Sequence, residues 1–373
     1  MSTGTMGFDP RSLAREEVIG LPVYSPGRSP EDIAREYGIP DCVKMASNEN
    51  PLGPSPRAME AISRAVGSVH LYPDPACTRL REAIAAKHGL GPENVLVSHG
   101  ADEVFDLLAF AFFERGDRVV VADPTFSSYE LAALTVGAEV VRVPLRDYRQ
   151  DVKAMAEAVD GRCKAVFLCS PHNPTGTTVS EDEFAYLLEK TADGCLVILD
   201  EAYVEYVDED AFWDSLGYLR GNPHLLVTRT FSKIYGLAGL RVGYALCWPE
   251  VREILEKVKL PFNVNRLAQE AALAALEDAQ HVERSREVNS RGKEKIYRIL
   301  EELGVFYVAS QANFILVKDP GRGDLFERLL RQGVIVRDGA ALGMPGHVRI
   351  TVGDDEQNAR LEEALRKAVE EPS

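Results

Sequence analysis

The sequence of 373 residues lacks a long apolar run: nothing approaches the roughly 18 consecutive apolar residues of a membrane-spanning helix, so no transmembrane segment is predicted. It also begins without the apolar stretch of a secretory signal, and we expect a cytoplasmic protein. Its six cysteines include no Cys-x-x-Cys spacing and several fall inside apolar runs, which favours reduced, buried thiols. Its seven histidines form no His-Glu-x-x-His motif, so no metal site is expected.

Positive charge is also in short supply. The chain has 42 basic and 58 acidic residues, for a net charge of −16, which argues against nucleic acid or an anionic membrane as a partner. An anionic substrate would need a local basic pocket, so single arginines become informative. No internal repeat or low-complexity tract occurs, and a hydrophobic content of 45% is enough for one large and one small domain.

A chemically rich stretch, residues 228–244, follows a short apolar run that is typical of a buried strand. Lys233 within it would be a nucleophilic amine if burial and neighbouring cations lowered its pKa. The hydroxyls of Thr230 and Ser232, with the guanidinium of Arg241, are suited to hold a phosphate. An amine beside a phosphate site indicates a Schiff base with pyridoxal phosphate, although a solvated loop would account for the same residues.

Two earlier strands end in polar residues that fit the same cofactor. Asp200 follows the apolar run 196–199, at the end of a strand where open α/β sheets contact their ligands. A buried carboxylate there would keep the pyridine nitrogen protonated, and a helix N-cap is the alternative role. Asn173 follows the apolar run 165–168 in a turn rich in proline, and its amide would donate to the cofactor's phenolate oxygen.

A further phosphate contact is expected where a helix begins after a short strand at residues 95–97. Gly100 stands just before this helix, and the exposed backbone amides of Ala101 and Asp102 would bind the cofactor phosphate with the helix dipole behind them.

Two arginines are predicted to form an anion clamp. Arg337 and Arg349 are each expected at the end of an apolar strand, and two guanidinium groups that converge on one pocket would bind a phosphate or a carboxylate. A surface ion pair is the alternative for each.

The alternation of short apolar strands with helical stretches over residues 95–247 predicts an α/β fold with a mostly parallel sheet covered on both faces. A charged amphipathic helix is predicted at about residues 267–303, before a smaller α/β domain. The expected organisation is an N-terminal arm that packs with the small domain (1–45), a large domain that binds the cofactor (46–265), and the linking helix with the small domain (266–373).

In the order strand-Asn, strand-Asp, strand-Lys, the chain resembles the fold-type I aminotransferases that depend on pyridoxal phosphate, and among them the histidinol-phosphate aminotransferase family. The resemblance extends over about residues 21–358 and includes Asn-Glu-Asn-Pro-Leu-Gly-Pro at residues 48–54. It implies a seven-stranded, mostly parallel sheet and amino transfer between L-histidinol phosphate and 2-oxoglutarate in histidine biosynthesis. Lys233 would then move protons as general acid and base while Asp200 keeps the ring protonated.

The same resemblance implies roles for five more residues. Phe126 would stack on the pyridine ring, Tyr203 would contact the cofactor, and Asn48 would lie at the substrate. Tyr72 would cross the interface of a homodimer to reach the partner's cofactor phosphate, and Tyr24 would reach the substrate's phosphate. Phe126 as a core residue and Tyr24 as a loop tether are the alternatives.

Three other functions are compatible with parts of the pattern. An aromatic amino-acid aminotransferase would use Arg349 for a carboxylate, and a decarboxylase of a phosphorylated amino acid would share many of the motifs. A non-enzymatic ligand sensor would need a basic helix-turn-helix extension, and the arm of about 40 residues is too short for one. The sequence departs from the family at His172, where an asparagine is frequent, and no role follows for it or for His99.

Overall fold

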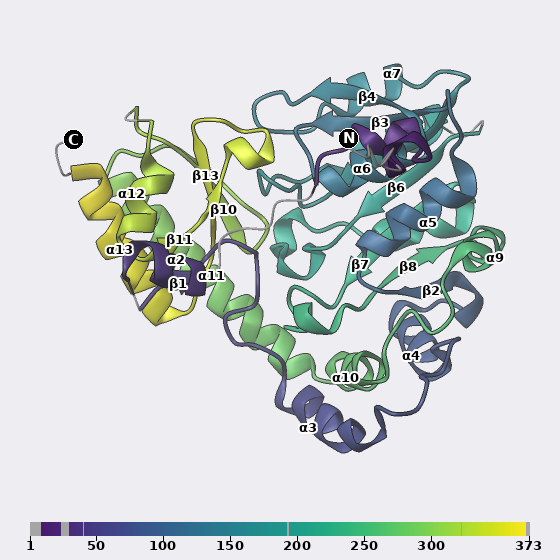
Figure 1. Cartoon of the computed structure of the whole chain (residues 1–373), viewed down its shortest axis with the longest axis horizontal. Coiled ribbons are helices and arrows are strands. Elements are labelled where there is room, and N and C mark those ends of the chain that lie inside the picture. Colours follow the sequence, from purple (N-terminus) through teal and green to yellow (C-terminus); the bar gives the residue numbers. More distant parts are fainter. Residues whose placement is uncertain (1–8, 24–29, 40, 192–193, 322, 371–373) are drawn as a thin grey trace, which may run out of the picture.

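The computed structural model describes residues 9–23, 30–39, 41–191, 194–321 and 323–370 (Figure 1). Its centre is a seven-stranded sheet in the order β2-β8-β7-β6-β5-β3-β4. The strands are β2 (Val95–Ser98), β3 (Arg118–Asp123), β4 (Glu139–Pro144), β5 (Cys163–Cys169), β6 (Leu196–Asp200), β7 (Leu225–Thr230) and β8 (Gly243–Cys247). Only β8 runs antiparallel to its neighbours β2 and β7, so the predicted mostly parallel sheet is confirmed.

Helices cover both faces of this sheet because its strands are apolar on both faces. Val119 and Val121 of β3 pack into the core under α5 (Asp102–Phe112), α6 (Ser127–Thr135) and α9 (Pro249–Val258), whereas Val120 packs into the opposite core. The helices on that second side are α3 (Pro56–Ala65), α4 (Thr78–His88), α7 (Val152–Glu157), α8 (Glu181–Thr191) and α10 (Arg266–Leu276).

A smaller antiparallel sheet with its own core lies beside the large one (Figure 1). Its order is β12-β13-β10-β9, and a separate parallel pair joins β1 to β11. The elements are β1 (Val43–Lys44), β9 (Tyr307–Val308), β10 (Phe314–Lys318), β11 (Val334–Ile335), β12 (Arg337–Asp338), β13 (His347–Thr351), α11 (Ala279–Glu302), α12 (Leu325–Arg331) and α13 (Asp355–Glu370).

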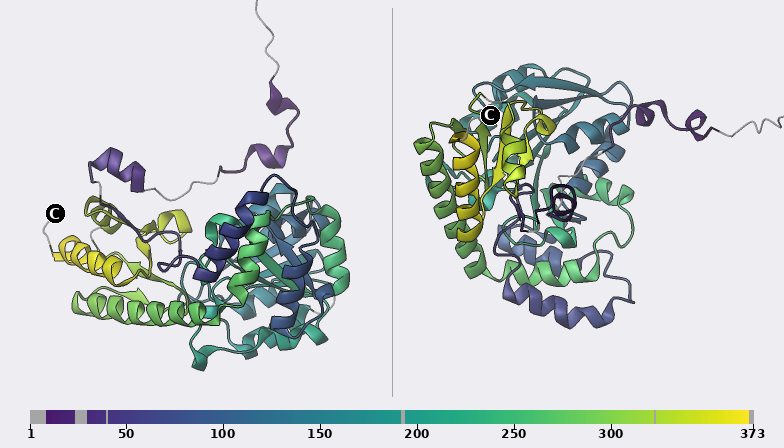
Figure 2. Two further views of the ribbon diagram at one scale, coloured as in Figure 1. Left: turned by 90° about the horizontal axis from the view of Figure 1, so that it is seen from below. Right: turned by 60° about the vertical axis from the view of Figure 1, so that its left-hand side comes forward.

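The N-terminal arm contacts both parts of the molecule (Figure 2, purple). In α2 (Pro30–Tyr37), Ile33 packs into a small core with residues of α12 and β11. Further upstream, beside α1 (Glu16–Ile19), Arg15 donates to the carbonyl oxygen of Thr135 at the end of α6 over 2.6 Å. The arm therefore spans from the small sheet to the large one.

The prediction of a single helix at residues 267–303 is wrong, because α10 ends at Leu276 and α11 begins at Ala279. The side chain of Asp278 accepts the backbone N–H of His281 over 3.3 Å, which caps a new helix where the amphipathic pattern runs on without interruption. The alanines of α10 pack under the large sheet, and α11 passes from the large core, where Val282 packs, to the small one, where Ile296 and Ile299 pack.

Within the described ranges, every helix is too short or too polar to cross a membrane. All six cysteines are free thiols, and all but Cys42 are buried.

Candidate active site

A cavity of about 320 Å³ opens at the carboxyl ends of β5, β6 and β7 and is bounded on its other side by the small sheet. Among its lining residues are the predicted site residues Asn48, Ala101, Asp102, Phe126, Asn173, Asp200, Tyr203, Thr230, Ser232, Lys233, Arg241, Arg337 and Arg349. Tyr72 lies elsewhere: it is 78% exposed and stacks on Phe262 with ring centroids 4.6 Å apart. Tyr24 is outside the described residues.

Lys233 follows β7 and directs its amine into the cavity. Nζ lies 3.4 Å from the carbonyl oxygen of Ser47, to which it donates, and 5.5 Å from the ring centroid of Tyr203. The hydroxyl of Thr230 accepts a backbone N–H two residues on, over 3.1 Å, and so shapes the turn that presents the lysine. Burial lowers the pKa of Lys233 to about 8, and the positive charge of Arg349 acts in the same direction. A substantial neutral fraction at physiological pH makes this amine a nucleophile and a base.

Asp200 ends β6 and is almost wholly buried, with 3% of its surface exposed. Oδ2 accepts the hydroxyl of Tyr129 over 2.5 Å, and Oδ1 accepts the hydroxyl of Thr228 and the N–H of Ala202, each over 3.1 Å. Burial raises the pKa of Asp200 to about 6, while the three donors favour its ionised form. Since a carboxylate offers about four lone-pair sites, one remains for a donor inside the cavity.

A cradle for an anion forms where α5 begins. Ala101 and Asp102 open the helix after Gly100, whose φ of +77° suits glycine. A Cβ at position 100 would lie 2.6 Å from Nη2 of Arg241, so a larger residue would displace this guanidinium. Arg241 donates to Ser232 Oγ over 3.4 Å and lies 3.5 Å from the carboxylate of Asp102. Helix N–H groups, a hydroxyl and a guanidinium together suit a phosphate.

The two arginines enter the cavity from neighbouring strands of the small sheet. Arg349 is the middle residue of β13 and Arg337 opens β12, so the expectation that each ends a strand is wrong. Arg337 pairs in register with Arg349, and Val336 separates β12 from β11. Arg349 donates from Nη1 to Asn173 Oδ1 over 2.6 Å and from Nη2 to the carbonyl oxygen of Ala46 over 2.8 Å.

Tyr203 is fixed by a residue from the other side of the cavity. Asn48 donates from Nδ2 to the hydroxyl of Tyr203 over 2.9 Å, and its own Oδ1 accepts the hydroxyl of Thr351 over 3.0 Å. Asn48 is 1% exposed and has a φ of 56°, a conformation that asparagine tolerates better than most residues. The loop at residue 48 therefore links the small sheet to a wall of the cavity.

His172, for which the sequence indicated no role, is fully buried beside the cavity. Its Nδ1 lies 2.9 Å from Thr175 Oγ1 and its Nε2 lies 3.2 Å from Thr125 Oγ1. Burial lowers the pKa of His172 to about 3, so the ring is neutral. It ties the turn that carries Asn173 to the segment that carries Phe126.

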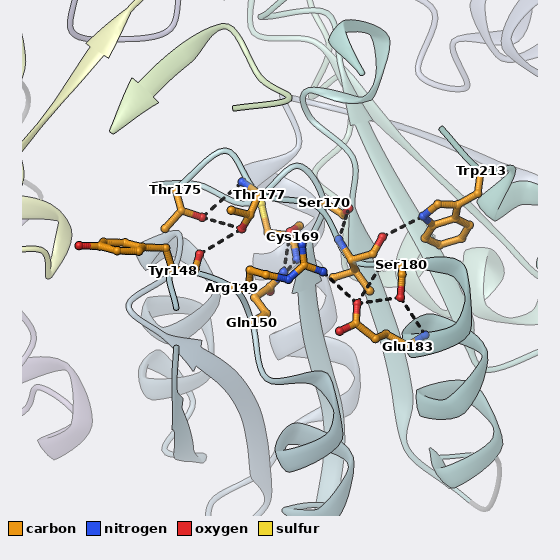
Figure 3. A network of polar contacts seen from close by, with 11 residues as sticks. Tyr148, Arg149, Gln150, Cys169, Ser170, Thr175, Thr177, Ser180, Glu183 and Trp213 are labelled. Atoms are coloured by element: carbon orange, nitrogen blue, oxygen red, sulfur yellow. Dashed lines mark hydrogen bonds and ion pairs between the residues drawn. The ribbon is translucent and has the colours of Figure 1, made fainter. Parts of the chain in front are cut away.

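Polar side chains also hold the turn that follows β5 (Figure 3). Gln150 pairs with the backbone of Cys169, donating to its oxygen over 2.7 Å and accepting from its nitrogen over 3.2 Å. Ser170 accepts the N–H of Val179 over 3.1 Å, and Trp213 donates to the oxygen of Val179 over 2.9 Å. These contacts fix both ends of the turn and so position Asn173.

Comparison with known proteins decides the family. The model of the class I and II aminotransferases matches residues 40–365. The histidinol-phosphate aminotransferase of Moorella thermoacetica is 47% identical over 355 residues, which cover 95% of this chain and 92% of that relative. This chain belongs to the histidinol-phosphate aminotransferase family. A second member of the family, from Symbiobacterium thermophilum, is 47% identical over 362 residues, covering 96% of this chain and 99% of the relative.

Solved structures agree with this assignment. The histidinol-phosphate aminotransferase of Sinorhizobium meliloti in complex with pyridoxal-5'-phosphate superimposes with a TM-score of 0.88 at 28% identity, covering 96% of this chain and 98% of that one. An aspartate aminotransferase mutant of Thermus thermophilus gives a TM-score of 0.81 at 27% identity over 96% and 98% of the two chains. The predicted fold-type I architecture and the dependence on pyridoxal phosphate are thus confirmed.

The cavity fits this cofactor on its own chemistry. The lone-pair site left on Asp200 suits a protonated ring nitrogen, the amine of Lys233 suits an aldehyde, and the cradle at Arg241 suits a phosphate. Two side chains that bind Asp200, those of Thr228 and Tyr129, were not predicted from the sequence. Thr228 could have been found, because it is a hydroxyl residue in a predicted buried strand, and it lies in register with Asp200. Tyr129 reaches Asp200 only through the packing of α6.

Proposed function

We propose that this aminotransferase moves the amino group of L-histidinol phosphate to 2-oxoglutarate, giving imidazole-acetol phosphate and glutamate in histidine biosynthesis. The proposal rests on one arrangement: a cavity that holds the amine of Lys233 also receives the guanidinium groups of Arg337 and Arg349. An amine for transfer chemistry and two cations for an anionic substrate are what a phosphorylated amino donor requires.

In the proposed mechanism, bound pyridoxal phosphate acts as the electron sink for the charge that develops at the substrate's Cα. Lys233, as a neutral amine, would take the proton from the substrate's Cα and would then serve as the acid that returns it. Asp200 would hold a negative charge beside the ring nitrogen, and its remaining lone-pair site would accept a hydrogen bond from that protonated nitrogen.

The amide of Asn173 is oriented by Arg349. Arginine can only donate, so the oxygen of Asn173 is the atom that faces Nη1 of Arg349, 2.6 Å away. Nδ2 is then left to donate to the phenolate oxygen of the cofactor. Phe126 would supply the ring contact, and Ala101, Asp102, Thr230, Ser232 and Arg241 would surround the phosphate.

On the substrate side, we assign Arg337 and Arg349 to the phosphate of histidinol phosphate or the far carboxylate of glutamate. Tyr203 and Asn48 lie at the same cavity and are linked by a hydrogen bond, which supports a shared role beside the substrate. Tyr24 is proposed as a further phosphate contact on the family resemblance alone.

We also propose a homodimer, located in the cytoplasm, in which Tyr72 reaches the cavity of a second copy. Two observations support it: Tyr72 is 78% exposed, and with Phe262 it lines a groove outside the cavity of its own chain. A large domain at residues 46–265 and a C-terminal part at 266–373 remain the proposed division, although α10 at the start of that part packs under the large sheet.

The test is the ratio of kcat/KM for histidinol phosphate to that for phenylalanine, with 2-oxoglutarate as acceptor. A ratio above about a hundredfold, or about 2.7 kcal/mol in transition-state binding, is expected. A ratio near one would instead indicate an aromatic or general aminotransferase. Release of carbon dioxide without a keto-acid acceptor would indicate a decarboxylase.

A matched pair of variants sharpens the test. Arg337→Gln should lower kcat/KM for histidinol phosphate more than for phenylalanine, because only the former carries a phosphate for that guanidinium. Arg366→Gln changes a partly exposed arginine of α13 that pairs with Glu302 and Glu362, and it should change neither value.

A further inference from the structure

Tyr129 is a fully buried tyrosine three residues after Phe126, and nothing in the transfer step so far uses it. Its hydroxyl donates to Asp200 Oδ2 over 2.5 Å, which is the shortest of the three hydrogen bonds that this carboxylate accepts. Short bonds to an ionised acceptor are the strong ones. Tyr129 is therefore a principal contact of the residue that would face the cofactor's ring nitrogen.

The ring of Tyr129 is fixed from three sides. It stacks on Phe167 with centroids 5.0 Å apart and an interplanar angle of 12°. Its contact with Phe105 is edge-to-face, at 4.8 Å and 89°, and its contact with Phe126 is edge-to-face, at 5.6 Å and 80°. These ring contacts fix the position of the hydroxyl beside the carboxylate of Asp200.

The contacts of Asp200 divide between its two oxygens. Thr228 and Ala202 both donate to Oδ1, whereas Tyr129 is the described donor to Oδ2. Removing the hydroxyl of Tyr129 would leave one oxygen without its donor and would weaken the ionised form in a buried setting.

We propose that Tyr129 is the positioning residue of the cofactor's ring nitrogen: through its hydroxyl it orients the carboxylate of Asp200 and keeps it ionised. The inference rests on the role of Asp200 in the proposed function. Burial and the neighbouring carboxylate hold the pKa of Tyr129 well above its ordinary value, so the hydroxyl stays a donor throughout the working pH range.

The test compares two ligands for the apoenzyme: pyridoxal phosphate and its carbocyclic analogue, in which CH replaces the ring nitrogen. Tyr129→Phe keeps the ring and removes only the hydroxyl. We expect it to raise Kd for pyridoxal phosphate about tenfold and to leave Kd for the analogue within about twofold, since the analogue makes no bond to Asp200. The ratio of the two Kd values is independent of any unfolded fraction, because unfolded chain binds neither ligand.

Tyr235→Phe is the matched control. Tyr235 is also buried, at 1% exposed, and its hydroxyl has no hydrogen-bond partner within the described part of the chain. Its removal should leave both Kd values within about twofold. In the Asp200→Ala background, Tyr129→Phe should have no further effect on the ratio, because the two changes act through one contact.

A Kd ratio that changes less than about threefold in Tyr129→Phe would overturn the inference, whether both ligands weaken together or neither does. The same measurements distinguish a failure of the role of Asp200 from a failure of the role of Tyr129. If the wild-type apoenzyme has no preference for pyridoxal phosphate over the analogue, the role of Asp200 fails and the inference fails with it. If the wild type has that preference and Tyr129→Phe keeps it, only the role of Tyr129 is refuted.

Discussion

The lowered pKa of Lys233 predicts a steep pH dependence for the capture of pyridoxal phosphate by the apoenzyme. With a pKa of about 8, about a quarter of the amine is neutral at pH 7.5. A free lysine, with a pKa near 10.4, is neutral in only about one molecule in a thousand at that pH. Because only the neutral amine attacks an aldehyde, the lowered pKa of Lys233 gives about two hundred times as much reactive amine.

Arg349 contributes to that shift, and its removal tests the cause. Its positive charge disfavours the ammonium form of Lys233, so Arg349→Gln should raise the pKa of Lys233. The pKa should stay below the ordinary value, because burial is the larger cause and remains. The rate of capture at pH 7.5 should then fall about fivefold to tenfold, and Arg366→Gln should leave it unchanged.

The assay is stopped-flow mixing of apoenzyme with pyridoxal phosphate between about pH 6.5 and 9.5, followed by the absorbance change on covalent capture. The second-order rate constant should rise with pH and level off above a midpoint near 8 in the wild type. A rate that does not vary with pH, or a midpoint above about 10, would refute the argument that burial activates this lysine. An unmoved midpoint in Arg349→Gln would refute the share given to Arg349.

Three further predictions concern other parts of the structure. Arg229→Met should lower the free energy of unfolding by about 3–5 kcal/mol in urea titrations. It removes the guanidinium that lies 2.7 Å from the buried carboxylate of Glu201 and leaves that charge without its cation. A loss below about 1 kcal/mol would contradict this. Equal mixtures of the inactive variants Tyr72→Ala and Lys233→Ala should recover about a quarter of wild-type activity after subunit exchange, since half of the dimers would hold one intact site. No recovery would count against a shared site. His172→Leu should lower kcat/KM about fivefold to tenfold. The factor should be the same at every pH from 6 to 8, because the imidazole ring is neutral throughout this range. A factor that varies with pH would disprove a neutral imidazole.

The catalytic centre was predictable from the sequence to the extent that it follows from strand ends. Asp200 comes directly after an apolar run and Asn173 and Lys233 come a few residues after theirs, and the carboxyl ends of parallel strands meet at one edge of the sheet. Residue types then limited the chemistry, because an amide, a carboxylate and an amine in this order have few common uses. Neither step required knowledge of side-chain packing.

Other features depend on contacts that no local pattern encodes. The bond from Tyr129 to Asp200 joins residues 71 positions apart and exists only because α6 packs over the sheet. The apolar residues beside Arg349 predict a strand that ends at it. In the structure Arg349 lies in the middle of β13, and its guanidinium lines the cavity. The break at Asp278 interrupts an apolar periodicity that continues on both sides, so only the cap reveals it.

That break has a mechanical consequence. α11 has 24 residues and is therefore about 36 Å long, and its far half is embedded in the core that supports β13. A turn of about 5° at its start would swing its far end through about 3 Å, by the geometry of a rigid rod of that length. Because α11 joins the two cores, a rotation of the backbone at residues 277–278 would change the distance between Arg349 in the small sheet and Lys233 after β7.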